Sequence, residues 1–246
     1  MRNPAVSTSN SPSPSPSPSR RQLFKSLGAA TLATVAIPVA IPVVQARQSA
    51  TAQDQAHAPS FFTPAEWAFV NAASARLIPN DSLGAGAAEA GVPEYIDRQM
   101  GTPWATGALW YMQGPFHADA PATLGYQSQL TPQQIFRLGI AAADDAMQKA
   151  HGKPFAQLAP QAQDAALHAI ESGRAVFETV PARLFFSMLL QSVREGFFAD
   201  PVHGGNRGLV GWKLIGFPGA RADFMDWVDR DVKYPLPPVA ISGQRG

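Results

Sequence analysis

The chain contains no cysteine among its 246 residues. It therefore forms no disulfide and cannot hold an iron–sulfur cluster through cysteine, nor attach haem through a Cys-x-x-Cys-His motif. Only five histidines are present, and no two of them have the i, i+4 spacing that pairs metal ligands on one helix face. The formal net charge of +1 gives no indication of nucleic-acid binding. We expect the chain to bind no metal, no cofactor and no nucleic acid.

The motifs of several enzyme classes are also missing. The sequence has neither a phosphate-binding Gly-Lys-Ser/Thr loop nor a Gly-x-Ser-x-Gly nucleophile elbow. Gly84–Glu89 begins like a dinucleotide fingerprint, but it lacks the last glycine and follows a helical pattern rather than a strand. Two acid–base candidates, Asp144 with Asp145 and His168 with Glu171, fit the solvated faces of amphipathic helices. We therefore predict no catalytic residues.

An export signal is present near the N-terminus. Arg20, Arg21 and Lys25 follow a Ser-Pro repeat and directly precede a modestly apolar run over 27–44. A positive segment before an apolar one is typical of a signal peptide, and paired arginines indicate the twin-arginine route, whose translocase carries folded proteins. A membrane anchor is the alternative, but the two prolines and many alanines of the run argue against a stable span.

The end of this signal defines the predicted domains. Val44 and Ala46 are the small residues expected at positions −3 and −1 of a cleavage site. We therefore predict a signal peptide over 1–46, a flexible linker over 47–60 and one folded domain over 61–246.

The folded part is predicted to be all-α. Thr63 and Thr131 are each followed by proline and, three residues on, by Glu or Gln, which is the pattern of a capped helix start. Apolar residues at helical spacing extend the prediction, and strand patterns are scarce. The predicted helices are 63–77, 91–100, 131–152, 158–173, 181–199 and 223–228. We expect a single irregular domain of about five to seven helices, with 181–199 at its centre because that segment is apolar on more than one face.

Two irregular segments separate these helices. The segment 101–130 is rich in aromatic residues, and the glycine-rich segment 200–220 has too many apolar residues to be disordered. Both are suited to a partner interface, since aromatic residues contribute strongly to interface energetics. The predicted interface residues are Trp104, Trp110, His203, Asn206, Arg207 and Trp212. A hydrolase using His203 with Asp200, or an independent exported binding protein, remains an alternative.

Four segments together resemble the small subunit of membrane-bound gluconate 2-dehydrogenase, the subunit 3 family. They are 62–66 (FTPAE), 77–81 (LIPND), 89–97 (EAGVPEYID), and 203–207 (HGGNR) running on to 217–220 (FPGA). Their order and spacing cover most of residues 61–230, and the export signal also suits the family.

The resemblance implies a periplasmic heterotrimer associated with the inner membrane. Its large subunit carries FAD and oxidises the substrate, and a multihaem cytochrome c subunit passes the electrons to quinone. The small subunit then binds no cofactor, has no catalytic residues of its own, and takes part in export and assembly. Small subunits of sorbitol, fructose and glucose dehydrogenases are comparable, so the resemblance leaves the substrate open.

Overall fold

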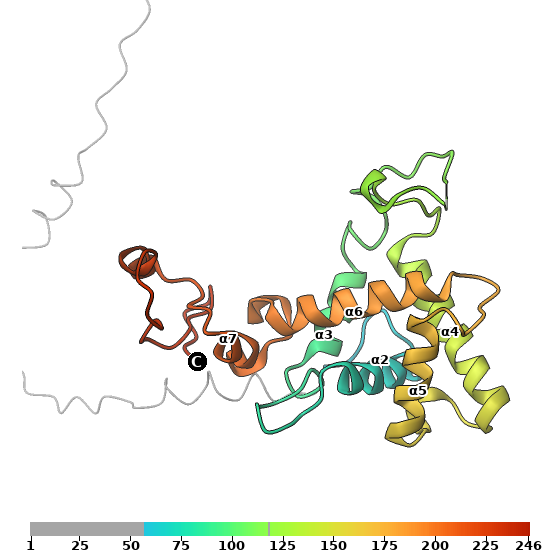
Figure 1. Cartoon of the computed structure of the whole chain (residues 1–246), viewed down its shortest axis with the longest axis horizontal. Coiled ribbons are helices and arrows are strands. Elements are labelled where there is room, and N and C mark those ends of the chain that lie inside the picture. Colours follow the sequence, from blue (N-terminus) through green and yellow to red (C-terminus); the bar gives the residue numbers. More distant parts are fainter. Residues whose placement is uncertain (1–56, 118) are drawn as a thin grey trace, which may run out of the picture. The chain divides into compact units, whose positions relative to one another are not determined.

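The structure is a computed structural model that describes residues 57–246, except Ala118. Within this part the chain is helical and contains no β-strand (Figure 1). The α-helices are α2 (Pro64–Leu77), α3 (Val92–Met100), α4 (Pro132–His151), α5 (Pro160–Glu171), α6 (Ala182–Phe198) and α7 (Val210–Ile215). The predicted all-α class is confirmed. The predicted signal peptide, 1–46, lies outside the described residues.

The two predicted helix starts are both capping boxes. Thr63 Oγ1 accepts a hydrogen bond from the Glu66 backbone N–H, and the Glu66 carboxylate accepts one from the Thr63 N–H at 2.8 Å. Thr131 and Gln134 exchange the same two hydrogen bonds at the start of α4. Each pair satisfies backbone donors that have no partner within the helix, so the sequence pattern fixes where α2 and α4 begin.

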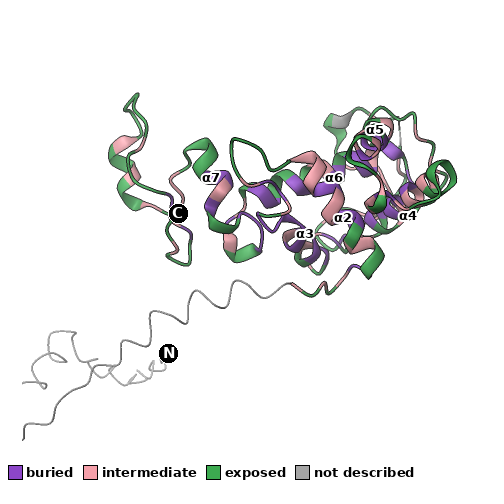
Figure 2. Cartoon of the chain, turned by 90° about the horizontal axis from the view of Figure 1, so that it is seen from below, coloured by how far each residue is buried: buried purple, intermediate pink, exposed green. Residues whose placement is uncertain are grey.

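Helix α6 lies at the centre of the helical packing, as predicted. It contacts α2, α3, α4, α5 and α7, and Figure 2 marks the buried residues of these helices in purple. Phe185 of α6 is fully buried against Phe69 and Phe136. Gly139 lets α4 approach, because a Cβ at this position would lie 2.2 Å from the Phe185 ring. This close packing places the two ends of α6 and the adjoining loops in fixed positions.

The segment between α3 and α4 is irregular, as expected, apart from one 3-10 turn at Ala122–Leu124. Figure 1 shows it as a long loop joining the two helices. Trp110 contacts Trp104 in a tilted arrangement and Tyr126 edge-to-face, with ring centroids 6.2 and 4.4 Å apart. We call residues 101–130 the aromatic arm. Its rings pack largely on one another, and Trp104 and Tyr126 also contact the core.

The segment 200–220 is more regular than the sequence indicated. It contains the 3-10 turns Pro201–His203 and Arg207–Leu209, followed directly by helix α7. Helix α7 has only six residues, which is too short for apolar periodicity to reveal. The helix predicted over 223–228 is a 3-10 helix, Ala222–Trp227.

Candidate functional site

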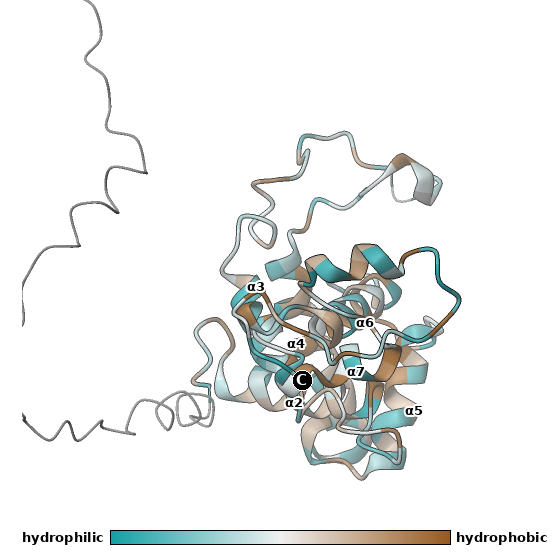
Figure 3. Cartoon of the chain, turned by 90° about the vertical axis from the view of Figure 1, so that its left-hand side faces the viewer, coloured by the Kyte–Doolittle hydropathy of each residue, from teal (hydrophilic) through white to brown (hydrophobic). Residues whose placement is uncertain are grey.

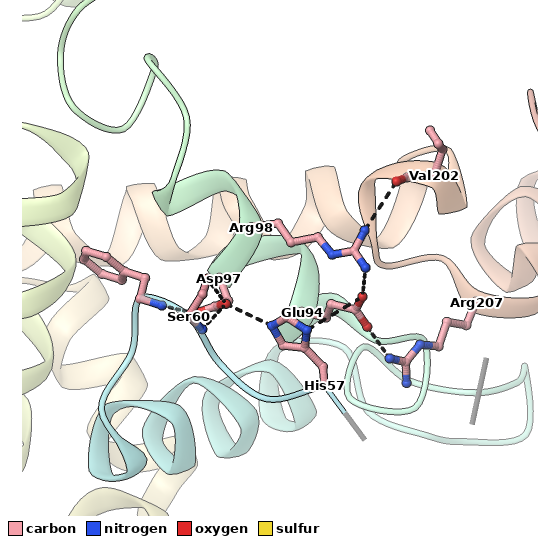
Figure 4. A network of polar contacts seen from close by, with 8 residues as sticks. His57, Ser60, Glu94, Asp97, Arg98, Val202 and Arg207 are labelled. Carbon is pink, nitrogen blue, oxygen red and sulfur yellow. Dashed lines mark hydrogen bonds and ion pairs between the residues drawn. The ribbon is translucent and has the colours of Figure 1, made fainter. Parts of the chain in front are cut away.

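The most elaborate polar site lies on α3, where Asp97 is completely buried. One carboxylate oxygen accepts hydrogen bonds from the backbone N–H and the hydroxyl of Ser60, at 2.8 and 2.9 Å. His57 Nε2 lies 2.9 Å from the same oxygen. The other oxygen accepts the backbone N–H groups of Phe61 and Phe62, at 2.9 and 3.1 Å. A single side chain therefore holds the whole chain segment that leads into α2 (Figure 4).

These contacts determine the charge of Asp97. Burial alone would raise its pKa, but the hydrogen bonds from Ser60, His57, Phe61 and Phe62 outweigh burial and lower the pKa to about 2. The carboxylate is therefore ionised at neutral pH. The same contacts correct one expectation, because residues 57–60 were assigned to a flexible linker and are instead fixed to α3 by Asp97.

Glu94 lies one helical turn before Asp97 on α3, and its side chain contacts a different set of residues. Its carboxylate forms ion pairs with Arg98 and Arg207, and His57 Nδ1 lies 4.0 Å away. Arg98 also donates to the backbone carbonyl of Val202, at 3.4 Å. Glu94 thereby connects α3 to the glycine-rich segment, which is more than a hundred residues away in the sequence. We call Glu94 and Asp97 with their partners the acidic hub.

The glycine-rich segment also closes the C-terminal end of α6. The last carbonyls of a helix have no partner within it. Here the side-chain amide of Asn206 donates to Ala199 O at 2.8 Å and its oxygen accepts the Gly211 N–H at 2.9 Å. The indole of Trp212 donates to Phe198 O at 2.7 Å. These bonds join the end of α6 to the start of α7.

The loop could not approach α6 this closely without glycine. At Gly205 the backbone has φ +67°, and a Cβ there would lie 2.2 Å from Gly196 O of α6. Gly196 in turn makes room for Tyr95, whose ring would lie 2.8 Å from a Cβ. Packing within the chain therefore requires glycine at Gly205 and Gly196.

The six predicted interface residues fall into two separate groups. In the loop, Asn206 is fully buried and Trp212 is only 6% exposed. Both side chains thus hold the end of α6, although they were predicted to contact a partner. His203 is exposed, and Arg207 is exposed but paired with Glu94. Of the four interface residues predicted in this segment, His203 and Arg207 are the two that a partner can reach directly.

Trp104 and Trp110 form the second group, in the aromatic arm. Both are partly buried by each other and by Tyr126. Two neighbouring side chains of the arm, Leu109 and Tyr111, are largely exposed. The arm therefore presents exposed apolar side chains next to the two partly buried tryptophans.

The geometry does not favour the hydrolase alternative. Both carboxylate oxygens of Asp200 accept backbone N–H groups, from Val202 at 3.0 Å and from Ile241 at 2.8 Å. His203 is exposed, and no side-chain hydrogen bond joins it to Asp200 in the described part of the chain. Across residues 57–246 other than 118, no group of His, Asp and Glu has the geometry to hold a metal ion.

The acidic hub was not among the sites predicted from the sequence. Glu94 and Asp97 lie inside the quoted segment EAGVPEYID, and their i, i+3 spacing puts them on one face of a helix. That spacing was a sign of a shared site. Arg98, at i+4 from Glu94, is the one partner on the same helix. The others could not be identified from the sequence, because they come from residues 57–62 before the helix and from Arg207 far beyond it.

The fold and the hub together define a small helical protein whose buried charges connect its own segments. The chain belongs to the gluconate 2-dehydrogenase subunit 3 family, because the model of that family matches residues 64–219, more than half of the chain. The match spans α2 to α7 and includes Glu94, Asp97 and Arg207. Searches of curated proteins and of solved structures found no match.

Family membership confirms the resemblance drawn from the sequence and relates the chain to a dehydrogenase made of several subunits. Among the helices that the structure describes, none combines the length and the apolar composition needed to cross a membrane.

Proposed function

We propose that this chain is the small, non-catalytic subunit of a periplasmic gluconate 2-dehydrogenase complex associated with the inner membrane. In this proposal a large FAD-containing subunit oxidises the substrate, and a multihaem cytochrome c subunit transfers the electrons to quinone. The observation that carries the proposal is the family match over residues 64–219. A second observation agrees with a non-catalytic role: the charged groups of the acidic hub hold segments of the chain together.

The role proposed for the subunit is to support export, assembly and stability of the flavoprotein. The twin-arginine pattern at Arg20 and Arg21 supports this role, because that route accepts folded cargo and one signal can export a preassembled pair. The rigid attachment of the loop to α3 and α6 gives the flavoprotein a preformed surface to bind, which lowers the entropic cost of association.

Sorbitol, fructose and glucose dehydrogenases are alternatives for the same role, since they too have a comparable small subunit. The choice depends on the partner's active site. Purification of the tagged chain from gently solubilised membranes, followed by flavin and haem spectra and dye-linked oxidation of each substrate, identifies the complex. A colourless eluate without such activity contradicts the proposal.

The export role has its own test. Replacing Arg20 and Arg21 with lysine keeps the positive charge but removes the twin-arginine pattern, so the flavoprotein should remain in the cytoplasm. Arg47→Lys, placed after the predicted cleavage site, is the matched control and should leave periplasmic activity unchanged. If the double variant exports the flavoprotein normally, the proposed role in export is wrong.

A further inference from the structure

An apolar cleft of about 540 Å³ lies between the segment that follows α2 and helix α7. One wall contains Ile78 and Leu83, and the other contains Phe197, Val210 and Leu214. The first wall precedes α3 in the sequence, whereas the second is formed by the end of α6 and by α7, so the cleft exists only in the folded chain. Both walls belong to the part of the chain that matches the family.

Both walls are held in place by bonds within the chain. On the first, Asp81 and Gly84 exchange two backbone hydrogen bonds of 3.1 Å, and Ala87 N donates to Ile78 O at 2.8 Å. On the second, Asn206 and Trp212 fasten α7 to the end of α6, as described above. The cleft is therefore preformed, and a partner would not have to order it.

The rim of the cleft is apolar and exposed. Leu83 is 74% exposed and Leu214 is 50% exposed, and both line the cleft. Ile215 at the end of α7 and Phe217 just after it are further exposed apolar residues, and Figure 3 colours the ribbon of the chain by hydropathy. Contiguous apolar surface around a cleft is typical of a binding site for another protein rather than of free surface.

One charged group in the cleft has no partner. Lys213 lines it, and within the described residues its ammonium group forms neither a hydrogen bond nor an ion pair. The acidic residue of the cleft, Asp81, already accepts the Leu83 N–H at 2.8 Å. An occupant that places a carboxylate near Lys213 would therefore complement the cleft in charge as well as in polarity.

From these features we infer that the cleft is the docking site for the FAD-containing subunit. The occupant is a segment of that subunit with apolar side chains and a neighbouring carboxylate, as in a helix that lays its apolar face in a groove. The apolar side chains enter between Leu83 and Leu214, and the carboxylate pairs with Lys213. This inference rests on the proposed function and specifies where the partner binds.

The test compares tagged variants purified from solubilised membranes of cells that make the whole complex. Flavin absorbance per mole of chain and dye-linked gluconate oxidation measure how much flavoprotein is bound. Leu83→Asp and Leu214→Asp should each lower the bound flavin at least tenfold. Lys213→Glu should lower it as well, and Lys213→Arg should keep it. Val176→Asp is the matched control, because Val176 is 87% exposed and lies outside this cleft.

The outcomes separate this inference from the proposed function. A wild-type chain that retains no flavoprotein contradicts both. A wild-type chain that retains it, with Leu83→Asp, Leu214→Asp and Lys213→Glu unchanged, overturns the docking site and leaves the proposed function standing. An equal loss in Val176→Asp also overturns the site, because the effect is then not local. If Leu214→Asp keeps the flavoprotein but loses sedimentation with phosphatidylglycerol vesicles, the cleft binds lipid and the inference is wrong.

Discussion

Asp97→Asn should destabilise the chain by an amount that depends on pH. The Asp97 pKa is lowered from 3.8 to about 2. At about 1.4 kcal/mol per pKa unit, this shift corresponds to about 2 kcal/mol of stability at neutral pH. Asparagine keeps the shape of the side chain but loses the charge. Its NH2 group must also face backbone N–H donors, from which it cannot accept a hydrogen bond. We therefore expect a further loss of about 1 kcal/mol that does not depend on pH.

The sign of the pH dependence follows from the lowered pKa. A carboxylate with a depressed folded-state pKa stabilises the protein above its unfolded value of 3.8, and this contribution is lost as the pH falls through about 2. The stability difference between wild type and Asp97→Asn should thus be about 3 kcal/mol at pH 7 and shrink toward about 1 kcal/mol below pH 2.

Urea denaturation of the full chain, followed by circular dichroism across this pH range, measures the difference directly. Asp145→Asn is the control, because Asp145 is exposed and pairs only with Lys149 on the surface of α4. Such a pair contributes less than about 1 kcal/mol. This prediction is refuted if the stability of Asp97→Asn differs from that of wild type by less than about 0.5 kcal/mol at pH 7, or if the difference stays constant down to pH 2. The charge of Asp97 would then not stabilise the fold.

Two further substitutions test how the loop and the core are held. Trp212→Ala should lower the stability of the isolated chain by about 3–5 kcal/mol, since it removes a buried ring and leaves Phe198 O without its indole donor. If the melting temperature is unchanged but the partner is lost, Trp212 contacts the partner directly. Gly139→Ala should cost about 1–3 kcal/mol, because the new Cβ would lie 2.2 Å from the Phe185 ring. Equal stability of wild type and Gly139→Ala would show that α4 can move away from α6.

The positions of the helix starts were predictable because their causes are local. Thr63 and Glu66 lie three residues apart, so their reciprocal hydrogen bonds can be predicted from neighbouring residues. The central position of α6 was predictable for a related reason, since apolar side chains around more than one face of a helix require neighbours on each. These features needed no knowledge of the rest of the fold.

What the sequence determined by itself is the helical class, the order of the main helices and the family, all of which rest on short-range patterns and motif order. Tertiary structure alone decided the acidic hub and the cleft. Asp97 meets Ser60, Glu94 meets Arg207, and Leu83 faces Leu214 across long stretches of chain. It also decided that Asn206 and Trp212 point inward, because burial depends on how α7 packs against the end of α6. Local patterns carry no information about such contacts, since the energy of a buried charge or ring is set by the partners that folding brings to it.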